Sequence, residues 1–460
     1  MRKFVVLVLL FIFGNAFSQE VLTLEEYLGY VKKYHPIIKQ AQLITSVGEA
    51  KLLKSRGAFD PKIEVDYQKK EFKSKEYYDR FNGSFKVPTW YGIEFKANYE
   101  KNSGMYLNPE MKTPKEGLYS AGISVSLAKG LLINERMATL KQAKLYEKQS
   151  AEKQKLVINK ILFNAVEVYL NWLKNYQAKK VYSNYLKNAE TRLKNVKTSF
   201  FAGDKPAVDT LEANINFKTR RLDFEKTNLV YLKSKLATAN YLWLDNNVPL
   251  EMSESLIPDE TTITKMDMIL KNSIADALNF NADEHPKLKQ LELKKQSLII
   301  NRRLKLNNLL PKIDLQYNFL SSDYQSFNSF NTNNYKGFLS ISMPIFVRKE
   351  RADLRLAKLK VNDIDFEISA TKVELQNKVK TILAQLDSYK KQQEIAKNLV
   401  SDYDKLIYSE QRKFELGEGS LFLVNYREVK QIENNLKYID SQYNFLSAKA
   451  KLLQALNGFY

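Results

Sequence analysis

The residue types that most often carry catalysis or bind metals are scarce in this chain of 460 residues. It has no cysteine and only two histidines, His35 and His285, each of which stands directly before a proline. Two isolated histidines without further ligands at suitable spacing do not make a metal site, so local capping or packing is the expected role of both. The sequence has no glycine-rich nucleotide loop, no nucleophile elbow and no paired-carboxylate motif. It therefore predicts no enzyme, no metal centre and no cofactor.

The N-terminal residues 1–18 have the pattern of a secretory signal peptide. Arg2 and Lys3 precede a short apolar run, and Ala16-Phe17-Ser18 places small residues at the cleavage positions. The mature chain is expected to begin near Gln19 and to be exported. No later stretch is apolar over the length that a membrane-spanning helix requires.

The net charge of +20 is spread along the chain. A basic protein of this kind could bind nucleic acid, but the lysines are scattered over helical stretches rather than clustered. Export also separates the protein from nucleic acid. The expected meaning of the charge is a solvated helical surface.

Two stretches without glycine or proline organise the chain. They are Leu131–Ala202 and Ile345–Leu416, and each has 72 residues. Because helix interiors exclude both residue types, each stretch predicts one very long helix, of about 108 Å at about 1.5 Å per residue. Each stretch ends at a glycine, Gly203 or Gly417, after which a second helical pattern begins. The sequence thus predicts two long helical hairpins.

Apolar residues in these helices recur about every 3.5 residues, which predicts coiled-coil packing through one seam on each helix. The seam residues are Ile364, Ile368, Thr371, Leu375, Val379, Ile382, Leu386 and Tyr389 before Gly417; Leu211, Ile215, Lys218, Leu222, Glu225, Leu229, Leu232, Leu236, Ala239 and Trp243 after Gly203; and Val429, Ile432, Leu436, Ile439, Tyr443, Leu446, Ala450 and Leu453 after Gly417.

Shorter elements before the long helices occur twice, at an offset of 250 residues. Thr23 caps a helix that ends at Tyr34, a second helix starts at Pro36, and a strand follows Pro61. The offset relates His35-Pro36 to His285-Pro286 and Pro61-Lys62-Ile63 to Pro311-Lys312-Ile313, and it makes Ser273 the equivalent cap. An offset shared by a helix, a break and a strand indicates duplication. The expected organisation is a first repeat over 19–244, a connector over 245–272 and a second repeat over 273–460.

Alternating apolar and polar residues predict a pair of strands in each repeat, near residues 63–68 and 119–127 and near 313–319 and 335–343. The first repeat has two further alternating segments, Phe81–Val87 and Tyr91–Tyr99. These segments either join a membrane barrel or form a cap above it. Four strands of about ten residues cannot close a barrel within one chain, and an open sheet edge is not viable in lipid. Strands from several chains must therefore combine, which predicts an oligomer.

In this order, the motifs resemble those of TolC-type outer-membrane efflux proteins, and the resemblance covers nearly the whole mature chain. The matching segments are Leu22-Thr23-Leu24-Glu25-Glu26, the two His-Pro pairs, Leu310-Pro311-Lys312-Ile313, Ser340-Ile341-Ser342-Met343-Pro344-Ile345-Phe346, the two glycine turns and the ending Leu453-Gln454-Ala455-Leu456-Asn457-Gly458. The resemblance implies a mainly α-helical protein with membrane strands. Its homotrimer would form a β-barrel in the outer membrane of a Gram-negative cell and an α-helical barrel in the periplasm.

The same resemblance implies the function of an exit duct in a tripartite efflux or type I secretion system. A periplasmic adaptor protein and an inner-membrane efflux pump or ABC exporter would be the partners, and drugs, dyes, metal ions or secreted polypeptides the substrates. The glycine turns would be the tips at which the adaptor docks, through Gly203, Asp204, Gly417 and Glu418. The family places acidic residues six and nine positions after each glycine at the periplasmic mouth.

These mouth positions are Asp209 and Glu212 after Gly203, but Leu423 and Tyr426 after Gly417, so only the first repeat keeps the acidic pattern. Acidic residues in a narrow pore favour cations, and the same residues also suit the positive N-terminal end of a helix. Both roles remain open for Asp209 and Glu212. The alternative function is that of a secreted coiled-coil structural or adhesive protein without a pore, which would explain the long helices but not the amphipathic strands.

Overall fold

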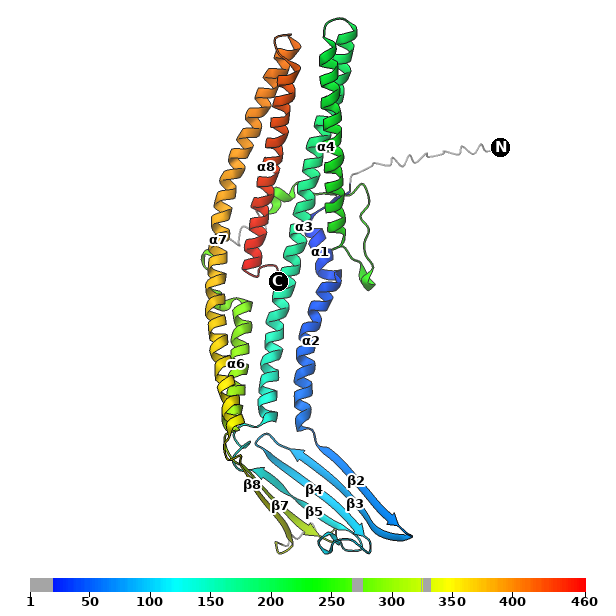
Figure 1. Ribbon diagram of the computed structural model, residues 1–460, viewed down its shortest axis with the longest axis vertical. Coiled ribbons are helices and arrows are strands. Elements are labelled where there is room, and N and C mark those ends of the chain that lie inside the picture. Colours follow the sequence, from blue (N-terminus) through cyan, green and yellow to red (C-terminus); the bar gives the residue numbers. More distant parts are fainter. Residues whose placement is uncertain (1–19, 267–275, 324, 326–331) are drawn as a thin grey trace, which may run out of the picture. The chain divides into compact units, whose positions relative to one another are not determined.

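A computed structural model describes residues 20–266, 276–323, 325 and 332–460 (Figure 1). The expected signal peptide and the expected cap Ser273 lie outside these residues. The chain divides into two compact units. Residues 40–157 and 281–376 form what we call the sheet unit, and the other described residues form the helical unit.

The sheet unit contains one antiparallel sheet of six strands within the described residues (Figure 1). The strands are, in spatial order, β2 (Lys62–Phe72), β3 (Lys75–Pro88), β4 (Ile93–Ser103), β5 (Leu118–Ser126), β7 (Lys312–Ser321) and β8 (Tyr335–Ser342). The two additional segments of the first repeat are thus β3 and β4, and they join the sheet between β2 and β5. The sequence left open whether these segments pair with the other strands, because alternation along one strand does not reveal which strand it pairs with; in the structure they do.

Four helices begin or end at the same end of this sheet. Within the sheet unit, α2 (Pro36–Arg56) leads into β2, and α6 (Pro286–Asn307) leads into β7. Strand β5 leads into α3 (Glu135–Phe201), and β8 leads into α7 (Arg348–Glu415). Because neighbouring strands are antiparallel, these four junctions lie together, at what we call the helix end of the sheet (Figure 1). The turn at residues 73–74 and the connection at 104–117 lie at the opposite end.

The two long helices are confirmed. Helix α3 has 67 residues and α7 has 68. Both begin a few residues later than the stretches free of glycine and proline. Asn134 accepts a hydrogen bond from the backbone N–H of Met137 at 2.8 Å and so caps α3, while Val347 has a φ of 42° directly before α7. Side-chain capping and a left-handed residue therefore decide the starts.

The helical unit adds α1 (Leu24–Tyr34), α4 (Ala207–Ala239) and α8 (Leu421–Ala455). Thr23 caps α1 as predicted, in a capping box with Glu26. The connector joins this unit through a short parallel pair, β1 (Val21–Leu22) with β6 (Ile257–Pro258). Buried Lys235 donates to the backbone carbonyls of Ser253, Glu254 and Leu256, which holds the connector against α4. The boundaries at 245 and 272 stay predictions, and the second lies outside the described residues.

The predicted seams are buried on α7 and on most of α8, but not on α4. Val379, Ile382 and Leu386 of the α7 seam form a core cluster with Ala448 and Leu452 of α8, which stand beside the predicted α8 positions, and with Ala277 and Ala455. On α8, the predicted positions Ile432, Ile439, Leu446 and Ala450 are buried, whereas Val429 is 37% exposed. On α4 the predicted seam positions from Leu211 to Leu236 are exposed, Ala239 and Trp243 are half-buried, and the buried positions are instead Ala213, Arg220, Tyr231, Ser234, Lys235 and Thr238. The predicted apolar stripe is present, and its coiled-coil packing stays a prediction because the stripe is exposed in the single chain.

The two His-Pro pairs are a repeated capping device. Nδ1 of His35 accepts the backbone N–H of Ile37 at 3.1 Å, and Nδ1 of His285 accepts that of Lys287 at 3.1 Å. Each bond satisfies a donor in the first turn of a helix that begins with proline. An imidazole can accept in this way only while that nitrogen is unprotonated. The predicted capping role of both histidines is confirmed.

The cap formed by His35 makes the free energy of unfolding depend on pH. Burial lowers the pKa of His35, and a hydrogen bond with the backbone of Asn240 opposes this effect. Because the unfolded chain takes up the proton first, the stability that His35 contributes is present above about pH 6.5 and is lost as pH falls through its lower folded pKa. We expect acidification to lower the melting temperature of the wild type more than that of His35→Asn, which keeps an acceptor that does not titrate. Equal pH dependence of the two melting temperatures would contradict this assignment.

Gly122 lies where β5, the last strand of the first half, pairs with β7, the first strand of the second half. It lies on β5 opposite Asn318 of β7, and a Cβ atom there would overlap the Tyr317 carbonyl oxygen and Asn318 Oδ1. A Cβ on Gly83, in β3, would meet nothing closer than 3.5 Å. We expect Gly122→Ala to lower the free energy of unfolding by about 1–3 kcal/mol and Gly83→Ala to change it much less. Urea unfolding of the two purified variants tests this, and similar midpoints would show that the backbone of β5 and β7 shifts freely to make room for the added methyl group.

Candidate functional site

The two helical hairpins of the helical unit end in matching glycine turns. Gly203 has a φ of 85° and Gly417 a φ of 80°. The backbone N–H of Asp204 donates to the Ser199 carbonyl at 2.9 Å, and that of Glu418 donates to the Lys413 carbonyl at 2.9 Å. Together with the N–H groups of the glycines, these bonds complete a Schellman motif at the end of both α3 and α7. The left-handed φ explains why glycine occupies both positions.

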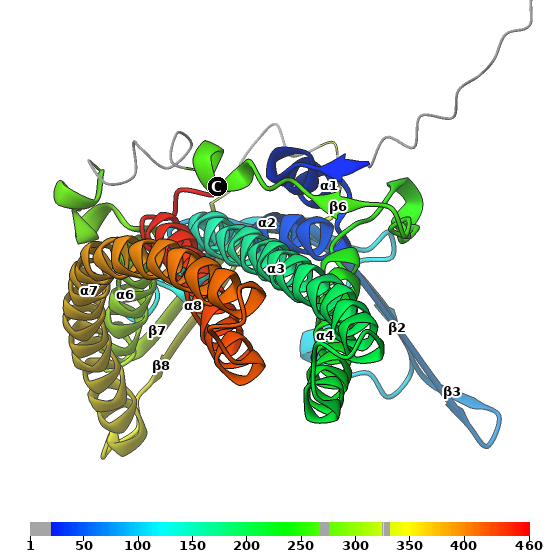
Figure 2. The same ribbon diagram turned by 90° about the horizontal axis from the view of Figure 1, so that it is seen from above.

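Figure 2, seen from above, shows the hairpin of α3 and α4 next to the hairpin of α7 and α8, and below the turns side chains from both hairpins form one buried cluster. Leu193 and Val196 of α3, Ala213 of α4 and Leu421 of α8 form one buried cluster. Phe217 and Phe414 pack against this cluster. The hairpin tips of one chain are therefore held together by an apolar core and not only by the backbone of each turn.

A buried ionic cluster lies next to this core. Arg192 of α3 donates from Nη1 to Glu428 Oε2 at 3.0 Å and from Nη2 to Glu428 Oε1 at 3.3 Å. Nη2 of Arg220, on α4, lies 3.8 Å from Glu428 Oε2. Glu428 is 1% exposed and Arg220 is 4% exposed. We call these three residues the Glu428 cluster; it ties together α3, α4 and α8.

The expected mouth residues lie at the start of α4 and α8. Glu212 Oε1 accepts a hydrogen bond from Asn425 Nδ2 at 3.0 Å, and Asn425 Oδ1 accepts one from Arg192 at 3.1 Å. Glu212 is thereby linked to the Glu428 cluster, which the sequence pattern did not indicate. Asp209 is in the first turn of α4, where its charge suits the helix dipole. Leu423 and Tyr426 are exposed on α8. That these four residues line a mouth remains a prediction.

The apolar periodicity of the helices did not predict the Glu428 cluster. Glu428 precedes the seam residue Val429, and Arg220 stands between the stripe positions Lys218 and Leu222. A helical wheel places such charges beside the seam, where solvent exposure is the usual outcome. Only the approach of three helices buries them. The single available signal was the presence of arginine rather than lysine at both cationic positions.

The apolar stripe of α4 faces away from the rest of its own chain. Its leucine and isoleucine side chains are between 49% and 59% exposed and comprise Leu211, Ile215, Leu222, Leu229, Leu232 and Leu236. A run of large apolar residues at helical spacing is unlike the scattered apolar residues of an ordinary surface. The stripe is thus a continuous apolar surface that the single chain leaves exposed.

The sheet has one apolar and one polar face. Cross-strand neighbours on the apolar face include Ile63 with Phe85, Phe95 with Ile123, and Leu315 with Leu339. The opposite face carries polar pairs such as Ser84 with Asn98. Among the described residues, neither β2 nor β8 has a partner on its outer edge. The described helices contain no segment apolar and long enough to cross a membrane.

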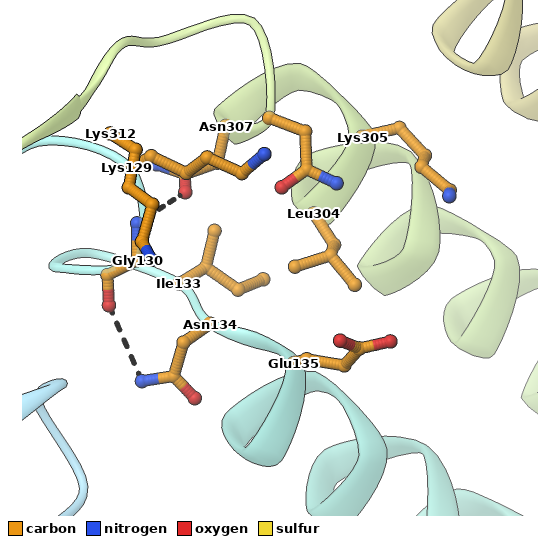
Figure 3. A pocket seen from close by; sticks show the side chains of 10 residues that line it. Lys129, Gly130, Ile133, Asn134, Glu135, Leu304, Lys305, Asn307 and Lys312 are labelled. Atoms are coloured by element: carbon orange, nitrogen blue, oxygen red, sulfur yellow. Dashed lines mark hydrogen bonds between the residues drawn. The ribbon is translucent and has the colours of Figure 1, made fainter. Parts of the chain in front are cut away.

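A pocket of about 230 Å³ lies at the helix end of the sheet (Figure 3). Gly130 N–H donates to Asn307 Oδ1 at 2.8 Å, and Asn134 Nδ2 donates to the Gly130 carbonyl at 3.3 Å. Figure 3 shows Lys129 and Lys312 next to each other at one side. Lys312 forms an ion pair with Asp314 at 3.0 Å. These contacts fix the joint between β5 and α3, and the pocket is a feature of that joint.

The described residues contain no group of three or more His, Cys, Asp or Glu side chains that could hold a metal ion. No curated protein sequence matches the chain significantly.

The sequence model of the outer membrane efflux protein family matches residues 281–458. Solved structures with the same fold include three outer-membrane proteins. The Campylobacter jejuni CmeC channel has a TM-score of 0.66 at 14% identity, over 95% of this chain and 86% of that one. The open state of the Neisseria gonorrhoeae MtrE channel has a TM-score of 0.66 at 14% identity, over 95% and 89%. Vibrio cholerae VceC has a TM-score of 0.65 at 9% identity, over 95% and 97%.

The TolC-like fold is therefore present over nearly the whole chain, and the second half also carries the sequence pattern of the family. The expected fold class, with long helices and membrane-type strands, is confirmed by these structures. The resemblance of this chain to the TolC-type outer membrane efflux proteins is thus confirmed, in sequence over residues 281–458 and in fold beyond them.

Proposed function

We propose that this protein is an outer-membrane channel that acts as a homotrimeric exit duct. Three copies would close their sheets into one barrel in the outer membrane of a Gram-negative cell, and their helices would stand in the periplasm. The duct would passively conduct substrates that an inner-membrane pump or ABC exporter delivers, in tripartite efflux or type I secretion. It would carry no catalytic activity and no cofactor.

The observation that carries this proposal is the amphipathic sheet with its two unpaired edges. An apolar face suits lipid, but exposed N–H and C=O groups along β2 and β8 have no water to bind in a bilayer. Pairing of β8 in one copy with β2 in the next satisfies both edges and generates a closed ring. The polar face then lines the inside, as in water-filled barrels.

The exposed stripe of α4 supports the same assembly from the helical unit. Contact with a neighbouring copy would bury the stripe, in coiled-coil packing of the kind its 3.5-residue spacing favours. The alternative, a secreted coiled-coil fibre without a pore, would also bury the stripe between copies. It would leave the apolar face of the sheet in water.

The hairpin tips are the surface proposed for the periplasmic adaptor. Gly203, Asp204, Gly417 and Glu418 form the two turns, and exposed apolar side chains adjoin them. Phe201 is 83% exposed, and Phe422 is also exposed. The four predicted mouth residues, Asp209, Glu212, Leu423 and Tyr426, lie within the first turns after these tips.

Reconstitution of the purified full-length protein tests the proposal. We expect native mass spectrometry in detergent to give the mass of a trimer, and planar bilayers to show stepwise channel currents. A protein that stays monomeric and soluble without detergent, and gives no currents, would overturn it. Deletion of a neighbouring adaptor or pump gene that leaves cellular efflux or secretion intact would reject the exit-duct role while leaving the channel in place.

A further inference from the structure

The β3–β4 hairpin gives the first half of the chain four strands where the second half has two. Strand β2 corresponds to β7 at the offset of 250, and the return strand β5 corresponds to β8. The second pair is adjacent in the sheet, whereas β3 and β4 separate β2 from β5. The hairpin is therefore an insertion into the sheet of one half.

Both inserted strands have the properties of membrane strands. They have 14 and 11 residues, which is long enough to cross a tilted barrel wall. Ten consecutive residue pairs join them, from Asp79–Ser103 to Pro88–Glu94, without a register shift. Phe81, Phe85 and Val87 continue the apolar face on β3, and Asn82, Ser84 and Lys86 continue the polar face.

The hairpin is also attached along both sides. Strand β3 pairs with β2 over eleven residue pairs, and β4 pairs with β5 over eight. At the helix end, Arg136 of α3 donates to Glu94 of β4 at 2.7 Å, and the ring of Trp90 stacks on Phe59 with centroids 5.6 Å apart. A cap lying above a barrel would have neither edge-to-edge pairing nor contacts at this end.

We propose that the inserted hairpin widens the membrane pore, so that the strand section of the duct admits bulky cargo of polypeptide size. This inference rests on the proposed trimer. Three copies of six strands give eighteen strands, whereas three copies without the hairpin would give twelve. With strands about 4.8 Å apart and tilted by about 40°, the backbone diameter is about 36 Å for eighteen strands and about 24 Å for twelve.

The difference in barrel diameter changes the size of the cargo that can pass through the strand section. Side chains of the polar face take up about 5 Å on each side, which leaves openings of about 26 Å and about 14 Å. A helix with its side chains is about 10–12 Å across, so the narrower opening accepts one helix and the wider one accepts a helical hairpin. The cargo class assigned by this geometry is a polypeptide that passes as a helical hairpin, or a solute of similar bulk.

Cysteine labelling tests whether the hairpin lies in the membrane wall, and the natural chain contains no cysteine to interfere. In wild-type-like trimers in vesicles, Phe85→Cys on the apolar face should react with a lipid-soluble maleimide but not with a charged, water-soluble one. Ser84→Cys on the polar face should react with the charged reagent. Met105→Cys, in the exposed loop after β4, is the control for full reactivity. Equal reaction of Phe85→Cys and Met105→Cys with the charged reagent would make the hairpin a cap and overturn the proposal.

A deletion tests the pore width itself. Removal of residues 75–103 joins the far end of β2 to the connection that leads into β5, as β7 is joined to β8. Polyethylene glycols of graded size, added only on the strand side of a planar bilayer, report the width of that entrance through the change in conductance. We expect the size cut-off to fall from about 26 Å to about 14 Å in the deletion variant. An unchanged cut-off in a variant that still conducts, or exclusion of polymers wider than about 14 Å by the wild type, would overturn the inference. A wild type that does not conduct would instead reject the proposed function.

Discussion

Replacing Glu428 with alanine should lower the free energy of unfolding of the helical unit by about 3–5 kcal/mol. The substitution leaves Arg192 and Arg220 without their shared carboxylate. Arg220 is 4% exposed and has two guanidinium nitrogens without a hydrogen-bond acceptor, so water cannot readily replace Glu428. The loss should appear in denaturant unfolding of the purified protein, followed by the helical circular dichroism signal.

The matched control for this prediction is an exposed ion pair on the same helix. Lys430 and Glu433 of α8 lie 2.9 Å apart, and their side chains are 37% and 45% exposed. Because solvent screens such a pair, Glu433→Ala should cost less than about 1 kcal/mol. Similar losses for Glu428→Ala and Glu433→Ala would show that the Glu428 cluster is not buried in the assembled protein.

A further variant tests whether stability requires the three charged side chains themselves or only that no buried charge is left unpaired. Replacing all three members of the cluster by apolar residues of similar volume, as Arg192→Met, Arg220→Met and Glu428→Leu, removes the unpaired charges together. Such replacements of buried ion pairs are often neutral or stabilising. We therefore expect the triple variant to be more stable than Glu428→Ala alone.

The second prediction with a large effect concerns the α4 stripe and rests on the proposed trimer. Leu222→Glu with Leu229→Glu places two carboxylates on a stripe that is exposed in the single chain, so the fold of one chain should tolerate them. In the trimer the same positions would be buried. Each lost leucine contact weakens the assembly by about 1.5–3 kcal/mol, before the cost of desolvating the new charges. We expect dissociation into monomers, with a dissociation constant raised more than about 100-fold.

Native mass spectrometry of the detergent-purified protein measures this shift. The control is Lys226→Glu with Lys233→Glu, which changes exposed positions of α4 beside the stripe, leaves every leucine of the stripe in place and changes the charge by twice as much. It should stay trimeric. Trimers in both variants would mean that α4 is not part of the contact between copies, and monomers in both would point to charge rather than to the stripe.

The sequence determined the elements because their signals are local. Absence of glycine and proline located α3 and α7 to within a few residues, and the threonine cap and the two His-Pro pairs located the shorter helices. The offset of 250 matched α2 and β2 with α6 and β7. Each of these signals depends on backbone preferences or capping within about four residues, which a sequence displays directly.

Tertiary structure alone decided which elements meet. The alternation of Phe81–Val87 predicted a strand, but membership of the sheet depends on backbone pairing with β2 and β4, which alternation does not specify. The stripe on α4 is visible in the sequence as a heptad pattern. Whether such a seam is buried within one chain or only against a second copy depends on where the neighbouring helices lie. The burial of Glu428 likewise arises from three helices separated by up to 236 positions in sequence. Contacts between segments that are distant in sequence have no local signature, and for that reason the helices and strands were predictable while the contacts between them were not.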